Sequence, residues 1–215
     1  MKRFYPSCNF ARIDIEAYRR LNEYARSRGL EVAKCCLKDK KDAEEGDEGY
    51  YICQACRPNV EKHGYDTISL WKLMDEDESF VFPDYSGLKV TVQDCWRDRE
   101  HPEIYHYIRS LLTKMHVEVE ELEGENFTDT QFCGRFHVDT KLYAEELAQY
   151  PDVGLLTNLP GDLFVRLMQE QAAKFHGGYA LVYCNTCYNN LKQGGANVIH
   201  IAQLVMNLFE MGREH

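Results

Sequence analysis

Nine cysteines in a chain of 215 residues limit what this protein can be more than any other feature of its sequence. They form two sets that share one order: a single cysteine, a central cysteine element and a terminal C-x-x-C pair. The first set is Cys8, Cys35, Cys36, Cys53 and Cys56, and the second set is Cys95, Cys133, Cys184 and Cys187. Because the same order recurs in both halves, the pattern indicates an internal duplication with long repeat units.

The segments around the C-x-x-C pairs support this duplication. Residues 51–57 align with residues 182–188, and residues 68–73 align with residues 199–204 at the same offset. The halves differ in spacing, because 16 residues separate the central element from the C-x-x-C pair in the first half and 50 do so in the second.

Short apolar strands alternate with amphipathic helices along both halves. Strands are expected at residues 4–5, 30–33, 50–52, 88–92, 117–122 and 179–183. Helices are expected at residues 14–28, around Pro58, from Pro102 to Met115, and, in the longer second gap, at about 139–148 and 160–175. Such alternation is typical of parallel sheets. It predicts an α/β fold with two pseudo-symmetric, Rossmann-like lobes of mostly parallel sheet, residues 1–86 and 87–215, which could also form one compact unit.

The cysteines fall at the ends of the expected strands. Open parallel sheets bind their ligands beyond the carboxyl ends of the strands. We therefore expect the sulfur atoms of each set to converge in one pocket per lobe. Trp96 and Tyr183 are expected to pack over a site, whereas Ser69 and His200 are expected in the helical core.

Composition and targeting signals set the compartment and the class of partner. The N-terminus has two basic residues but lacks the apolar stretch of a secretory signal. No apolar run reaches the length of about 18 residues that a membrane span needs. We expect a cytoplasmic protein without a direct membrane span, whose thiols stay reduced. The formal net charge of −10 argues against nucleic acid and anionic membranes as partners.

Reduced thiolates are soft ligands, so sites built from cysteine alone favour zinc or iron–sulfur clusters. Side chains of neighbouring residues on extended backbone point in opposite directions. Cys35 and Cys36 are therefore poorly placed to serve one small ion together, whereas an extended cluster with several metal atoms can use both. Five thiolates also exceed the four of a tetrahedral zinc site. The four cysteines of the second set suit zinc or a cubane [4Fe-4S] cluster.

At this point the pattern resembles the cysteine-rich (CCG) domain found in the B-type component of heterodisulfide reductase and in related iron–sulfur oxidoreductases. The resemblance extends from Tyr5 to about Leu208, and its best local match is the stretch that joins Asp94-Cys95-Trp96, Phe132-Cys133-Gly134 and Cys184-Asn185-Thr186-Cys187. It implies noncubane [4Fe-4S] clusters, each held by five cysteines, in disulfide reduction or electron transfer. Some members of the family carry zinc in a degenerate copy.

Carried onto this sequence, the resemblance implies a noncubane [4Fe-4S] cluster in the first lobe and a [4Fe-4S] cluster or zinc in the second. The cofactor-binding residues would be Cys8, Cys35, Cys36, Cys53 and Cys56, and the metal ligands would be Cys95, Cys133, Cys184 and Cys187. Such an oxidoreductase component would need a partner protein that donates or accepts electrons. The sequence departs from the family at Leu37, where glycine is common, and at Phe132, which replaces a ligand.

Other interpretations of the cysteines stay open from the sequence. A zinc-binding module without redox activity needs only the four-cysteine set. A metal-free dithiol oxidoreductase would use one C-x-x-C pair, either Cys53/Cys56 or Cys184/Cys187. The cysteines could also be small hydrophobic core residues. His137 is a candidate ligand or hydrogen-bond donor, and a packed or surface histidine is the alternative.

Overall fold

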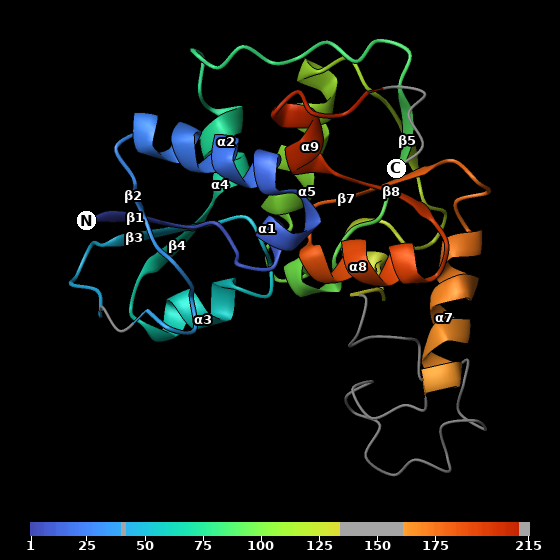
Figure 1. Ribbon diagram of the computed structural model, residues 1–215, viewed down its shortest axis with the longest axis horizontal. Helices are drawn as coiled ribbons and strands as arrows, with labels where there is room; N and C mark the ends of the chain where they lie inside the picture. Colours follow the sequence, from blue (N-terminus) through green and yellow to red (C-terminus); the bar gives the residue numbers. More distant parts are fainter. Residues whose placement is uncertain (40–41, 134–160, 211–215) are drawn as a thin grey trace.

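The computed structural model describes residues 1–39, 42–133 and 161–210 and divides into two lobes, each with a four-stranded, all-parallel sheet (Figure 1). The strands of the first sheet are β1 (Lys2–Tyr5), β2 (Glu31–Val32), β3 (Glu48–Tyr51) and β4 (Asp66–Ser69). Those of the second are β5 (Lys89–Val92), β6 (Glu118–Glu121), β7 (Tyr179–Val182) and β8 (Asn197–His200). The spatial orders, β2-β1-β3-β4 and β6-β5-β7-β8, are the same order in each half. The predicted α/β fold with two Rossmann-like lobes is therefore confirmed.

Helices connect the strands of both sheets. The α-helices are α1 (Phe10–Ile13), α2 (Ile15–Ser27), α3 (Arg57–Lys62), α4 (Leu70–Asp75), α5 (Glu103–Lys114), α7 (Gly161–Ala173), α8 (Asn185–Gln193) and α9 (Ile201–Val205). Two short 3-10 turns are η1 (Trp96–Asp98) and η2 (Phe127–Asp129). None of these helices is both long enough and apolar enough to cross a membrane.

Most predicted elements form close to their expected bounds. The helix expected at 14–28 is α2, which begins after Asp14 because the Asp14 carboxylate accepts a hydrogen bond from the Ala17 N–H at 2.9 Å. The helix expected at 160–175 is α7. The strand expected at 30–33 is shorter, since only Glu31 and Val32 pair with β1. The helix expected at 139–148, together with Gly134 and His137, lies outside the described residues.

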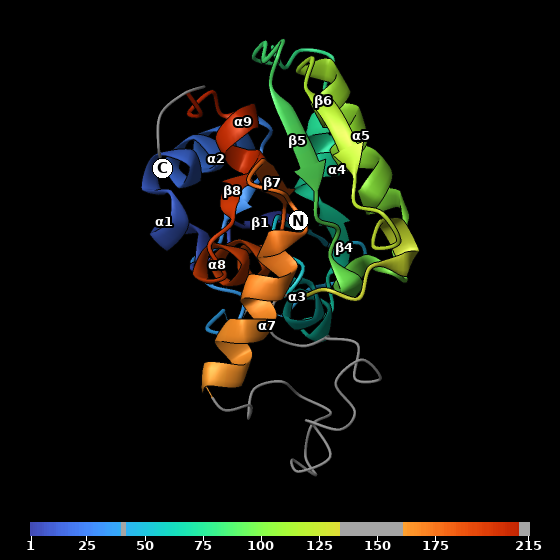
Figure 2. The same ribbon diagram turned by 90° about the vertical axis from the view of Figure 1, so that its right-hand side faces the viewer.

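The two lobes exchange helix contacts in a reciprocal way. In the repeat, α4 corresponds to α9 and α2 corresponds to α5. Helix α4 of the first lobe packs against α5 of the second, and α9 of the second packs against α2 of the first, as the two views together show (Figures 1 and 2). Ser110 donates to Asp75 at 2.6 Å in one pair, and Arg20 donates to the Met206 carbonyl at 2.8 Å in the other. One continuous apolar core joins both lobes.

Ser69 and His200 hold equivalent places in this arrangement, because each caps the helix that follows the last strand of its sheet. The Ser69 hydroxyl accepts from the Trp71 N–H at 3.3 Å, and His200 Nδ1 accepts from the Ala202 N–H at 3.2 Å. Both side chains are buried, as expected for core residues. Their function is nevertheless specific, since they satisfy helix N–H groups that would otherwise have no acceptor.

Helix α8, which carries one end of the second cysteine set, is fixed by a close approach to α7. A β-carbon added at Gly194, the residue after α8, would lie 2.1 Å from the Met168 carbonyl oxygen. Because that obstacle is helix backbone, a side chain at this position forces the two helices apart.

We predict that Gly194→Ala lowers the free energy of unfolding by about 1–3 kcal/mol or more, the usual range for overpacking. Urea unfolding followed by circular dichroism measures the change. Gly161→Ala is the matched control, because a β-carbon at Gly161 would meet no atom within 4 Å. Equal stabilities for the two variants would contradict the close packing of α7 on α8.

The His200 cap gives a prediction about pH. Burial lowers the pKa of His200 from 6.5 to about 3. Between these values the unfolded chain binds a proton that the folded chain does not, so stability falls as pH falls below about 6.5. In His200→Asn, which can still cap the helix but does not titrate, this loss should be smaller by up to about 1.4 kcal/mol per pH unit. Unfolding free energies measured from about pH 7 to about pH 5 test this; parallel curves for the two proteins would contradict it.

Candidate metal centre

The four cysteines of the second set meet at the carboxyl end of their sheet. Cys95 lies three residues beyond β5. Cys184 lies two residues beyond β7 at the N-cap of α8, and Cys187 lies in the first turn of that helix. Cys133 lies four residues after η2. All four sulfur atoms lie within 4.8 Å of one another, and none of the four residues is more than 1% exposed. The residues predicted as metal ligands thus form a buried group that could bind a metal.

An arginine stabilises negative charge on this group. Arg97 Nε donates to Cys133 Sγ at 3.2 Å, and Cys95 Sγ lies 3.5 Å from the same sulfur. Hydrogen bonds from the neighbouring thiols, together with Arg97, hold the pKa of Cys133 well below its usual value. Burial raises the pKa of Cys95. A thiolate is therefore stabilised at Cys133, and thiolates are the form of cysteine that binds metals.

A buried polar network holds Cys95 in place from behind. The Tyr183 hydroxyl accepts from the Cys95 N–H at 2.9 Å and lies 3.2 Å from an Asp94 carboxylate oxygen. Arg109 donates to both oxygens of Asp94, at 2.6 and 2.7 Å. Tyr183 is completely buried, and its hydroxyl binds the backbone of Cys95.

The first set of cysteines is arranged differently. Cys8 Sγ lies 4.0 Å from Cys35 Sγ near the surface, whereas the Cys36 thiol interacts with Cys56 and accepts a long hydrogen bond from Asn59 at 3.8 Å. The neighbours Cys35 and Cys36 thus have different partners, although they begin a turn rather than lying on extended backbone. The five sulfurs of this set do not form a group as compact as the second set.

Hydrogen bonding tunes the thiols at the inner end of the first set. A hydrogen bond with Cys56 is the main cause that lowers the pKa of Cys36 to about 7. The main cause that raises the pKa of Cys53 to about 11 is a hydrogen bond with Cys184. A thiolate is therefore accessible at Cys36 near neutral pH.

The interaction of Cys53 with Cys184 joins the two sets across the boundary between the lobes. We expected one pocket in each lobe, and the sequence contains no signal that the pockets adjoin. The contact arises because the reciprocal helix packing turns the carboxyl ends of both sheets toward each other. The first set therefore interacts with the second at Cys53 and Cys184.

Sequence reasoning missed the charged residues around the sulfurs. Arg97 follows Cys95 by two positions, and that proximity is the one signal that could have identified it. Asp98 is fully buried, and burial raises the pKa of its carboxyl well above the usual range, although Arg57 lies 3.4 Å from it. Trp96 is only half-buried and lines a cavity beside the sulfurs.

Three comparisons with known proteins gave no match. No protein-family model, curated protein or solved structure matches the chain. The function of the site therefore has to be inferred from its own donor atoms and their geometry.

The network behind Cys95 gives a prediction. Tyr183→Phe leaves the buried Cys95 N–H without its acceptor, which should lower the free energy of unfolding by about 1–3 kcal/mol. Loss of such an outer contact should also weaken zinc binding by about 10–100-fold, measured by competition with a chromogenic chelator. Tyr179→Phe, the same change at the opposite end of β7, is the control. Unchanged zinc affinity in Tyr183→Phe would show that the hydroxyl does not orient Cys95.

Proposed function

We propose that this chain is a redox metalloprotein similar to the cysteine-rich components of heterodisulfide reductase, with a zinc ion in the second lobe and a [4Fe-4S] cluster in the first. The observation that carries the proposal is the buried group of four sulfurs in contact with a second set of five thiols. The proposed partner is a protein that exchanges electrons with this chain.

The second lobe favours a single metal ion. Four ligands at the zinc–sulfur distance of about 2.3 Å in a tetrahedron place their sulfurs about 3.8 Å apart. The sulfurs of Cys95, Cys133, Cys184 and Cys187 all lie within 4.8 Å of one another. This spacing suits one ion better than a cluster, whose four metal atoms need ligands that are further apart. Bound zinc would hold the ends of β5, β7 and α8 together.

The first lobe favours a cluster with several metal atoms. Its five sulfurs spread from exposed Cys8 to buried Cys53, and they exceed the four ligands that tetrahedral zinc uses. Iron–sulfur clusters are held by cysteine thiolates, and their potentials depend on hydrogen bonds to the sulfurs and on exposure. Asn59 supplies one such hydrogen bond to Cys36.

Exposure at one end of the first set supports a function in electron transfer. Cys8 is exposed and Cys35 is half-buried, so the ligands of this lobe reach the surface, where a partner protein can approach. Cys53 extends the same set inward to Cys184. When bound, a cluster supplies one-electron chemistry, and the protein contributes the thiolates, the shielding and the surface for the partner.

Metal analysis of protein prepared and reconstituted without oxygen tests the proposal. We expect about four irons, about four sulfides and about one zinc per chain, with visible absorption. Cys36→Ser should lose iron and keep zinc, whereas Cys133→Ser should lose zinc and keep iron. Each variant is therefore the control for the other.

A second candidate function, a zinc module without redox activity, is favoured by the compact four-sulfur group alone. It predicts about one zinc per chain, no iron after reconstitution and no visible absorption. That result would overturn the iron–sulfur proposal. A chain that binds neither metal would overturn both candidates.

A further inference from the structure

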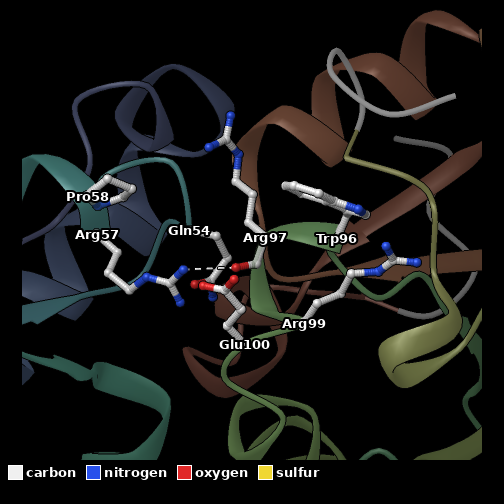
Figure 3. Close-up of a pocket in the computed structure, with 7 residues that line it drawn as sticks. All are labelled: Gln54, Arg57, Pro58, Trp96, Arg97, Arg99 and Glu100. Atoms are coloured by element: carbon white, nitrogen blue, oxygen red, sulfur yellow. Dashed lines mark hydrogen bonds between the residues drawn. The ribbon is translucent and has the colours of Figure 1, made fainter. Parts of the chain in front are cut away.

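A cavity of about 410 Å³ lies beside the cysteine sets, and residues of both lobes line it (Figure 3). Gln54 lies inside the first C-x-x-C pair, and Arg57 directly follows that pair. The opposite wall is the segment 96–100, which follows Cys95 in the second lobe. The cavity volume is within the range of about 300–1,000 Å³ that is typical of small-molecule sites.

Gln54 points to a missing ligand. Its side chain lines the cavity and is completely buried, and within the described part of the chain neither its Oε1 nor its Nε2 has a hydrogen-bond partner. Figure 3 places it in the middle of the lining residues. Buried amides are normally hydrogen-bonded, because leaving them unpaired is unfavourable. A bound molecule with both a donor and an acceptor would satisfy it.

The repeat shows that an amide nitrogen at this position can find a protein partner, although the side-chain oxygen of Asn185 also lacks one among the described residues. Asn185 is the equivalent of Gln54 in the second lobe, and its Nδ2 donates to Ser7 Oγ across the lobe boundary at 2.7 Å. The amide nitrogen is therefore satisfied by protein in one half, whereas in the other half it faces a cavity.

Positive charge surrounds the cavity, although the chain as a whole carries a formal net charge of −10. Three guanidinium groups line it, those of Arg57, Arg97 and Arg99, against the single carboxylate of Glu100. Arg57 is already committed, because it donates to the Arg97 carbonyl at 2.9 Å and pairs with Asp98 at 3.4 Å and with Glu61 at 3.5 Å. Arg99 Nε is buried without a hydrogen-bond partner among the residues that the structure describes.

Trp96 adds a flat apolar wall. Its ring is half-buried and lies 5.8 Å from the guanidinium carbon of Arg99. Arginine recognises carboxylate and phosphate groups through paired charge-assisted hydrogen bonds. The lining can therefore bind three parts of a ligand. Arg99 suits an oxyanion, Gln54 suits a polar group that both donates and accepts hydrogen bonds, and Trp96 suits an apolar face.

We propose that this cavity binds a small organic oxyanion, a carboxylate or phosphate compound, next to the metal centre. Arg99 binds the oxyanion, Gln54 hydrogen-bonds a neighbouring polar group, and Trp96 covers the apolar part. Arg97 lines the same cavity and also donates to Cys133 Sγ, so the ligand lies beside the proposed zinc ligands. This site goes beyond the proposed function and does not depend on which metal is bound.

Tryptophan fluorescence of the full chain can report occupancy directly. The chain has two tryptophans, of which Trp71 is completely buried and Trp96 lines the cavity. Titration with inorganic phosphate, citrate or AMP should give a saturable change, with sodium chloride at equal ionic strength as the blank. The change should disappear in Trp96→Phe. A preference for citrate or for AMP distinguishes a carboxylate ligand from a phosphate ligand.

Variants test whether the named side chains bind the anion. Arg99→Gln and Gln54→Leu should each raise the Kd by about tenfold or more, and Arg99→Lys should have a smaller effect because it keeps the charge. Arg19→Gln removes one positive charge from the exposed face of α2 and should leave the Kd unchanged. Calorimetry on the same samples gives the Kd independently of fluorescence.

The outcomes separate this proposal from the metal assignment. No saturable response to any of the three probes, or a Kd unaffected by both Arg99→Gln and Gln54→Leu, would overturn the anion site. The metal content of each sample is measured in parallel. Anion binding by a protein without iron would contradict only the proposed cluster, and intact metal content without anion binding would contradict only this site.

Discussion

The interaction between the thiols of Cys53 and Cys184 is the constraint on which the arrangement of this molecule depends, because it links buried groups of the two lobes. Buried thiols tolerate such proximity if they share protons through hydrogen bonds or bind a common metal. Arg97 contributes charge on one side, and the polar network of Asp94, Tyr183 and Arg109 holds the backbone on the other. The sheets, the helix caps and the close packing of α7 on α8 all position these few atoms.

Much of this arrangement follows from pattern. Alternating strands and helices predicted both sheets, and the position of each cysteine after a strand predicted that Cys95, Cys133, Cys184 and Cys187 would converge. These are consequences of local periodicity and of one topological rule, so they need no knowledge of long-range packing.

The remaining features depend on how the lobes pack, which periodicity does not encode. The pairs α4·α5 and α2·α9 bring the two sheet ends together, and apolar helix faces alone do not specify their partners. The cavity between Gln54 and Arg99 is a product of that packing, as is the salt bridge between Arg57 and Asp98. His200 was expected in the core, but its cap on α9 depends on the residue at which that helix begins.

The reciprocal pairing of α4 with α5 and of α9 with α2 also bears on the origin of the chain. Because α9 is the equivalent of α4 and α5 is the equivalent of α2, both contacts join the same pair of equivalent helices. Two identical lobes could therefore form a dimer in which each protomer uses the same two helices, as a closed twofold interface requires. Fusion of two such genes would preserve that interface inside a single polypeptide. After fusion the two sides of the interface are encoded separately, so they no longer have to be identical. The halves could then diverge, one keeping five thiols and the other four. A half-chain expressed alone would expose the apolar faces of both helices, and the two halves mixed together would be expected to reassemble.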